Sequence, residues 1–165
     1  MTRLVLLTLC ALASTSLATA QTVFVVRHAE RADAVSGGDT MMAADPELSK
    51  AGQARAGSLA AMLTDAGIAA VFASDTKRAQ QTGAPLAKAL GLTVQVVPAK
   101  DTAALVAKVK GTKGNVLVVG HSNTVPEIVK ALGVSTPVTI GDSDYDNLFV
   151  VTLGPPPAVV RLHFK

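Results

Sequence analysis

The chain is poor in aromatic side chains and in cysteine. Of its 165 residues only 3% are aromatic, tryptophan is absent, and the one cysteine is Cys10. Proteins that bind single-stranded nucleic acid stack bases on aromatic rings, so this composition argues against a nucleic-acid partner despite a formal charge of +3. One cysteine cannot form a disulfide framework. The chain is nevertheless 49% hydrophobic, which predicts one ordinary globular domain with a core of its own.

The chain has one long apolar run, and it lies at the N-terminus. Arg3 precedes an apolar stretch over 4–17, and Ala18-Thr19-Ala20 has the small-x-small pattern of a signal-peptidase site. The run is shorter than the ~20 residues that a membrane-spanning helix needs, and a retained membrane anchor is the alternative. We therefore expect 1–20 to be a signal peptide and 21–165 to form one domain. The mature protein is expected to be periplasmic or secreted, without stable membrane insertion.

Strand and helix patterns alternate along the rest of the chain. The predicted strands cover 22–27, 69–73, 92–97 and 116–120, and the predicted helices cover 50–65, 76–90, 101–110 and 126–132. Gly, Pro and Asp residues mark 34–46 as an exposed loop. Two final strands, over 147–153 and 158–164, are typical of a pair at a sheet edge. This order predicts an α/β fold with a mainly parallel sheet, helices on both faces and a terminal antiparallel edge strand.

Charged side chains follow three of the predicted strands directly. The segments are Arg27-His28-Ala29-Glu30-Arg31, Ser74-Asp75-Thr76-Lys77-Arg78 and Gly120-His121-Ser122-Asn123. In open α/β sheets, ligands bind beyond the carboxyl ends of the strands. Two of the chain's three histidines and three arginines are therefore expected at one edge.

This residue set suits a phosphate group. Arginine forks bind phosphate oxygens bidentately, and fixed positive donors stabilise the charge of a phosphoryl-transfer transition state. A neutral imidazole among them can attack phosphorus and form a phosphohistidine. We expect the neighbouring arginines to lower the histidine pKa by repulsion, and a backbone carbonyl to hold the other ring nitrogen.

Metal chemistry is not expected. The segment 142–147 begins like a calcium loop, but Asn147 stands where that loop requires Gly and Leu153 where it requires Glu. We interpret it as a solvated acidic loop. Zinc is disfavoured because the paired histidines lie among arginines. No metal or other cofactor is therefore predicted.

The segment Val26-Arg27-His28-Ala29-Glu30 resembles the arginine-histidine signature of the histidine phosphatase superfamily. Three further segments, 48–54, 74–82 and 119–123, resemble its other motifs and occur in the family's order, so that the resemblance spans about 22–130. The resemblance implies a phosphoglycerate mutase-like fold. Among its members the chain is similar to the small bacterial phosphohistidine phosphatases, here in an exported form.

The resemblance also implies roles for individual residues. His28 is the expected nucleophile, and Arg27, Arg78 and His121 are expected to bind the transferring phosphoryl group. Further substrate contacts are expected from Arg31 and Asn123, with local capping as the alternative.

The proton donor is less well defined. The acid-phosphatase branch has Asp directly after its second histidine, where this chain has Ser122. Glu30 and Asp101 are the two candidates, and each has a structural alternative. Glu30 can pair with an arginine, and Asp101 can cap a helix.

The resulting prediction is an exported, metal-independent phosphatase that hydrolyses phosphomonoesters or phosphohistidine through a covalent intermediate on His28. Its partner would be a small phosphorylated substrate or a phosphoprotein. One alternative is a phosphate-recognising binding module with low activity. Another is acid-base catalysis on RNA by His28 and His121. The sequence leaves the substrate and the oligomeric state open.

Overall fold

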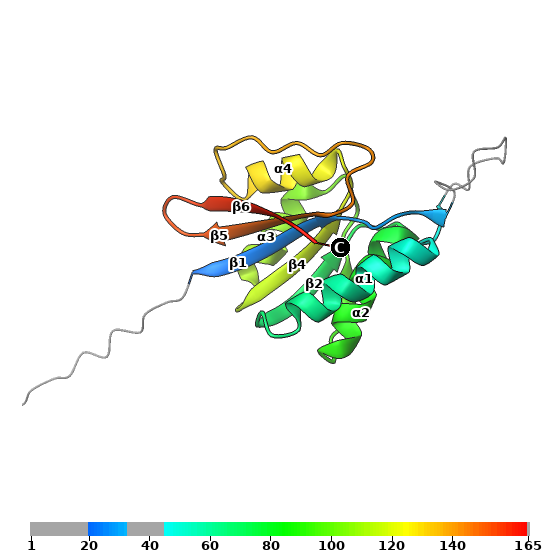
Figure 1. Cartoon of the computed structure of the whole chain (residues 1–165). Coiled ribbons are helices and arrows are strands. Elements are labelled where there is room, and N and C mark those ends of the chain that lie inside the picture. The colour runs from blue at the N-terminus through cyan, green and yellow to red at the C-terminus, as the bar shows by residue number, and fades with distance from the viewer. Residues whose placement is uncertain (1–19, 33–44, 165) are drawn as a thin grey trace, which may run out of the picture.

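The computed structural model describes residues 20–32 and 45–164 (Figure 1). The expected signal peptide and nearly all of the expected loop at 34–46 lie outside the described residues. The elements are β1 (Gln21–Arg27), α1 (Lys50–Leu63), β2 (Ile68–Ala73), α2 (Lys77–Ala89), β3 (Val94–Val96), α3 (Thr102–Gly111), β4 (Asn115–Gly120), α4 (Thr124–Ala131), β5 (Asn147–Leu153) and β6 (Ala158–His163). Within these residues, no helix is long and apolar enough to cross a bilayer.

The strands form one mixed sheet in the order β3-β2-β4-β1-β5-β6. The first four are parallel, whereas β5 pairs antiparallel with β1 and β6 antiparallel with β5. The predicted α/β class, the mainly parallel sheet and the antiparallel edge are therefore confirmed. The predicted boundaries differ in detail, because β3 is limited to Val94–Val96 and α4 begins at Thr124, two residues before Pro126.

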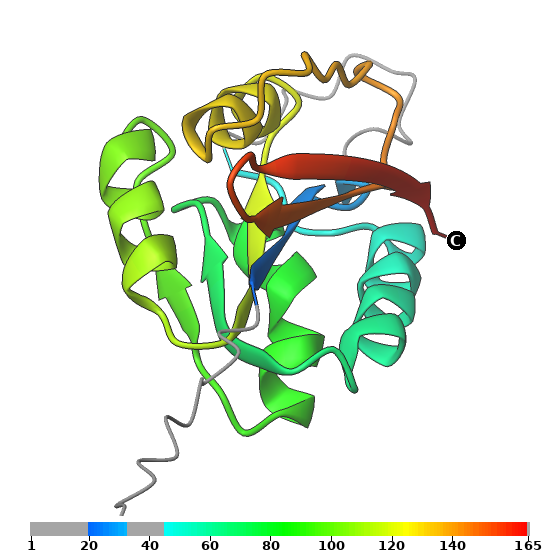
Figure 2. The same ribbon diagram turned by 90° about the vertical axis from the view of Figure 1, so that its left-hand side faces the viewer.

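Each face of the sheet is covered by two helices, α1 and α2 on one side and α3 and α4 on the other (Figures 1 and 2). Side chains alternate across β4 as the period of a strand requires. Val116 and Val118 pack with α3 and α4, while Leu117 and Val119 pack with α1 and α2. All four are at most 1% exposed, so this strand is buried on both faces, as its continuous apolar sequence predicts.

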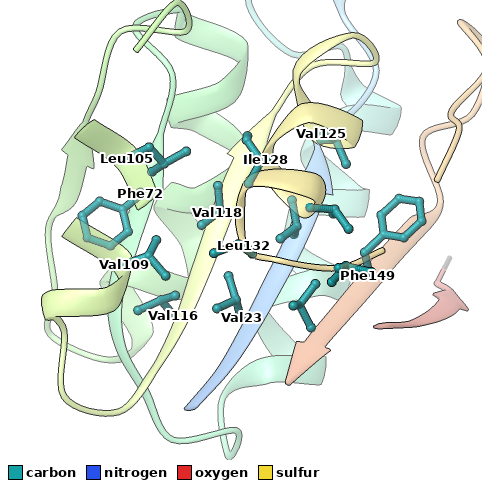
Figure 3. Packing of buried hydrophobic residues seen from close by; sticks show 14 of the residues in the cluster. Val23, Phe72, Leu105, Val109, Val116, Val118, Val125, Ile128, Leu132 and Phe149 are labelled. Atoms are coloured by element: carbon teal, nitrogen blue, oxygen red, sulfur yellow. The ribbon is translucent and has the colours of Figure 1, made fainter. Parts of the chain in front are cut away.

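The core beneath α3 and α4 is aliphatic with a few aromatic rings (Figure 3). Leu105 and Val109 of α3 and Val125, Ile128 and Leu132 of the α4 region lie over β4 and β1. Phe72 and Phe149 extend the cluster to either side of these strands. Burial of this kind contributes about 1.5–3 kcal/mol for each large apolar side chain and holds the strand ends in place.

Two glycines allow the backbone to approach closely near those strand ends. A side chain at Gly52, in the first turn of α1, would collide with the carbonyl of Glu30. At Gly120 a Cβ would lie 2.8 Å from Oγ1 of Thr124. The loop after β1 and the turn after β4 can therefore each lie directly against a helix N-terminus.

Candidate active site

The site is built where the parallel strands end. Arg27 of β1 is in register with Gly120 of β4, and the ladder continues one step further, where the His28 N–H donates to the Gly120 carbonyl over 2.9 Å. On the other side of β4, the Ser74 N–H donates to the Val119 carbonyl over 3.2 Å. The sheet register thus brings the three segments that follow β1, β2 and β4 to one edge.

These segments open onto a cavity of about 710 Å³. All six residues predicted to bind or attack the phosphoryl group line it: Arg27, His28, Arg31, Arg78, His121 and Asn123. Thr76, Ala99, Ser122, Asp142 and Tyr145 complete the lining. A cavity with several arginines and paired imidazoles suits a multiply charged oxyanion.

His28 is held in one tautomer. Its Nδ1 lies 2.8 Å from the Ala29 carbonyl, which can only accept, so Nδ1 carries the proton and Nε2 keeps its lone pair. Nε2 accepts a hydrogen bond of 3.1 Å from Nε of Arg78. His28 is 3% exposed. Burial lowers its pKa to about 3, assisted by His121, Arg78 and Arg27 and opposed by the Ala29 hydrogen bond.

The sequence-based explanation for the low pKa of His28 was incomplete. We predicted repulsion by arginine, but desolvation has the larger effect on the pKa of His28. A buried imidazole loses hydration of its charged form even where no cation is near, and composition does not reveal how deep a residue will lie. The consequence for the chemistry is the same, because His28 is neutral across the ordinary pH range.

His121 lies opposite, with its ring centroid 5.1 Å from that of His28 and the two rings at 66°. Its Nε2 is 2.8 Å from the Ser74 hydroxyl, and its backbone N–H donates to Oγ1 of Thr124 over 2.9 Å. Burial and the charge of Arg78 lower the His121 pKa to about 4. His121 is therefore a neutral hydrogen-bonding group in a fixed orientation.

The side chain of Arg27 is held by hydrogen bonds to the loop that precedes β5. Its Nη1 donates to the carbonyls of Gly141 and Asp142 over 3.0 and 2.8 Å, and its guanidinium lies 4.2 Å from the centroid of the Tyr145 ring. The residue is 7% exposed, yet among the described residues its Nε has no acceptor. A buried donor without a partner is costly in a folded protein and often marks a ligand site.

Arg78 stands in the first turn of α2, where a cation is disfavoured by the helix dipole. Asp45 offsets this, because its two carboxylate oxygens each accept from the Lys77 N–H over 3.1 Å. Oδ1 of Asp45 also lies 3.5 Å from Nη1 of Arg78. The carboxylate therefore serves as a cap for α2 and restrains the arginine beside His28.

The two predicted proton donors lie outside this cavity. Glu30 forms an ion pair with Arg55, with three contacts of 2.7 to 3.0 Å. Burial acts to raise the Glu30 pKa, but the hydrogen bonds and charge of Arg55, a backbone hydrogen bond and the charge of Arg27 together hold that pKa below its ordinary value. Asp101 caps α3, with its side chain accepting from the Ala104 N–H over 2.9 Å. The structural alternatives considered for both residues match these contacts.

Several side chains at the site were not singled out by sequence reasoning. They are Asp45, Ser74, Asp142 and Tyr145. Tyr145 is the one tyrosine of the chain, and that rarity was an available signal. We had interpreted 142–147 as a solvated acidic loop, whereas its first residue and Tyr145 contact Arg27. Among the described residues, no three His, Cys, Asp or Glu side chains converge as metal ligands.

The fold and the site together define an α/β protein with a histidine-arginine oxyanion pocket. The family model for the histidine phosphatase superfamily (branch 1) matches residues 23–100, which include the first two of the three site segments. Residues 23–100 of this chain therefore match this superfamily, and the match supports a phosphatase of the histidine phosphatase class.

Solved structures agree with that assignment at the level of the fold. The protein histidine phosphatase SixA, complexed with tungstate, is 21% identical, with a TM-score of 0.66 over 87% of this chain and 97% of that one. A mycobacterial glucosyl-3-phosphoglycerate phosphatase, in complex with VO3, is 17% identical, with a TM-score of 0.64 over 86% and 97% of the two chains. No curated protein matches the sequence significantly.

Proposed function

We propose that this protein is an exported, metal-independent phosphatase that hydrolyses phosphomonoesters or phosphohistidine through a phosphohistidine on Nε2 of His28. The observation that carries the proposal is the state of that ring. His28 is buried and neutral, its proton is on Nδ1, and its lone pair on Nε2 lies beside Arg78. A nucleophile for phosphorus needs this combination of tautomer and charge.

In the first step, Nε2 of His28 attacks phosphorus and the bond from phosphorus to the leaving oxygen breaks. Nε of Arg78 donates to the same lone pair over 3.1 Å in the free protein. A bound phosphoryl group would take over this donor, which frees the lone pair and supplies a hydrogen bond to a phosphoryl oxygen. Water then attacks the phosphohistidine, phosphate leaves and His28 is restored.

The positive charge around the transferring group would come from arginine. Arg27 and Arg78 carry this charge on their guanidinium groups, whereas His28 and His121 are neutral. The Nε of Arg27, which lacks an acceptor among the described residues, would gain one from a phosphoryl oxygen. Fixed donors of this kind stabilise the charge that spreads over the equatorial oxygens in phosphoryl transfer.

Export rests on the sequence of 1–20. Expression of the whole chain, followed by cell fractionation and N-terminal sequencing, tests it. We expect a periplasmic or secreted product that begins at Gln21. An intact N-terminus in the membrane fraction would instead support the retained anchor.

The catalytic proposal is tested with purified mature protein in EDTA. We expect turnover of a chromogenic phosphomonoester and of a phosphohistidine peptide, and an acid-labile phosphoenzyme on rapid quenching. His28→Ala should lose both the intermediate and at least about 10⁴-fold in kcat/KM, the size of effect expected for a nucleophile. Vanadate binding without turnover at any pH from 4 to 8 would instead identify a phosphate-binding module.

A further inference from the structure

The proposed reaction needs a proton for the leaving oxygen, and most acidic side chains near the site have other partners. Glu30 is paired with Arg55 and Asp101 caps α3. Asp45 is held by Lys77 N–H and Arg78. Asp75 accepts from the Ala99 N–H over 3.2 Å. None of these four carboxylates lines the cavity that contains His28.

We propose that Asp142 is the proton donor to the leaving group, an inference that rests on the proposed function. Within the part of the chain that the structure describes, Asp142 is the acidic residue that lines the cavity with His28. It reaches the site from the loop between α4 and β5. This part of the sequence lies beyond the residues that the family model matches.

Asp142 is attached to the site at two points. Its backbone carbonyl accepts from Nη1 of Arg27 over 2.8 Å, and its side-chain Oδ1 accepts from the Ser122 hydroxyl over 3.1 Å. Arg27 precedes His28 in sequence, and Ser122 follows His121. Both anchors therefore belong to the segments that carry the paired histidines, and they fix the carboxyl relative to them.

The kind of partner distinguishes Asp142 from Glu30. The guanidinium of Arg55 holds Glu30 as a carboxylate, which cannot donate a proton. The side chain of Asp142 instead accepts a hydrogen bond from the neutral hydroxyl of Ser122, which imposes no such charge. Ser122 can also donate to one oxygen while the other carries the proton. Asp142 is exposed, so it can exchange protons with solvent between turnovers.

The proton balance of the two steps is then complete. As Nε2 of His28 bonds to phosphorus, the P–O bond breaks and the leaving oxygen takes the proton of Asp142, giving a free alcohol and an Asp142 carboxylate. In the second step, the carboxylate takes a proton from the attacking water as its oxygen bonds to phosphorus. The N–P bond breaks, inorganic phosphate leaves, and Asp142 is again protonated.

The dependence of rate on the leaving group tests the proposal. Asp142→Asn keeps the size, the backbone carbonyl and an acceptor for Ser122, but carries no proton that it can transfer. For an alkyl phosphate, a poor leaving group, we expect kcat/KM to fall on the order of 100-fold, as is typical when a general acid is lost. For 2,4-dinitrophenyl phosphate, whose leaving group needs no proton, the loss should stay below about fivefold.

Two further variants complete the experiment. Ser122→Ala removes the hydrogen bond that positions Asp142, so the same discrimination between the two substrates is expected at smaller size. Asp146→Asn is the matched control, because it removes a negative charge from the same loop but pairs with His163 rather than facing the cavity. It should retain wild-type kinetics with both substrates.

An equal loss on both substrates in Asp142→Asn, or no loss on either, would overturn the assignment. His28→Ala, measured in parallel, separates this failure from failure of the proposed function. If His28→Ala is inactive while Asp142→Asn treats both substrates alike, the covalent mechanism stands and the donor is wrong. If His28→Ala retains activity, the covalent mechanism itself is wrong.

Discussion

Both ends of the parallel strands carry polar side chains, yet the two ends differ in how those side chains are bonded. At the amino ends, Asn115 accepts from the Thr22 N–H and donates to the Ala66 carbonyl, over 2.8 and 2.7 Å. The side-chain amide of Gln21 donates to the carbonyls of Val109 in α3 and of Thr112 and Gly114 after it, over 2.8 to 3.0 Å. Polar groups at this end hold neighbouring segments together.

At the carboxyl ends of the strands, some buried hydrogen-bond donors have no acceptor among the described residues. Among the described residues, both buried side-chain donors without an acceptor, Nε of Arg27 and Nδ2 of Asn147, lie at this end of the sheet. Asn147 lies there because Leu148, the next residue, is in register with Val26. Two imidazoles with low pKa values lie there as well. Hydrogen-bond donors that find no acceptor within the described residues thus distinguish the carboxyl ends, which we call the binding end, from the amino ends, which we call the structural end.

Arg78→Ala should have the largest effect on the binding end. Nε of Arg78 donates to Nε2 of His28, the expected nucleophile, and Arg31 lines the same cavity. We expect kcat/KM to fall about 10²–10³-fold in Arg78→Ala, the usual cost of losing a preorganised donor to the transition state, and less in Arg31→Ala. Steady-state kinetics with a chromogenic phosphomonoester measures both.

Lys77→Ala is the control for that comparison, since it removes an exposed cation from the same turn of α2. It should change kcat/KM little. Equal losses in the Arg78 and Arg31 variants would show that the two arginines have been ranked wrongly.

Asn115→Ala should destabilise the fold at the amino ends of the parallel strands. Two backbone groups would lose their partners, so we expect the free energy of unfolding to fall by about 2 kcal/mol. Urea denaturation measures this change. The kcat of the folded fraction should stay within about twofold, because a stabilising contact distant from the reacting atoms is not part of the transition state.

Asn115→Asp offers a graded version of the same test. It keeps the acceptor for Thr22 and loses the donor to Ala66, so its stability should fall between those of wild type and Asn115→Ala. A large loss of kcat in either variant would mean that the two ends of the sheet are not independent.

Acidification should produce the smallest effect. The His28 pKa is about 3 in the folded protein and 6.5 in the unfolded chain, so between these values the unfolded chain binds more protons. The free energy of unfolding therefore falls as pH drops through this window, by about 1–2 kcal/mol from pH 7 to pH 5 for this residue. Denaturation at the two pH values should show a smaller decrease in His28→Asn than in wild type. An equal decrease in both proteins would mean that His28 titrates normally.

The sequence was sufficient to predict the fold class, the strand order along the chain and the three segments that meet at the site. Buried parallel strands are read from local composition, and the position directly after such a strand identifies Arg27, His28 and His121. It was not sufficient for partners that depend on tertiary packing. Glu30 pairs with Arg55, and the carbonyls of Gly141 and Asp142 accept hydrogen bonds from Arg27. These contacts depend on how segments distant in sequence pack together, so local residue spacing cannot predict them.

The hydrogen bond from the His28 N–H to the Gly120 carbonyl extends the pairing of β1 and β4 into the site itself. Successive strand residues face opposite sides, so a slip of β1 by one position would turn His28 away from His121 even if the core still closed. The specific activity recovered after refolding would therefore report the fraction of molecules in which β1 and β4 are in the correct register. Circular dichroism, which measures helix content, would not distinguish these molecules from those with a shifted register.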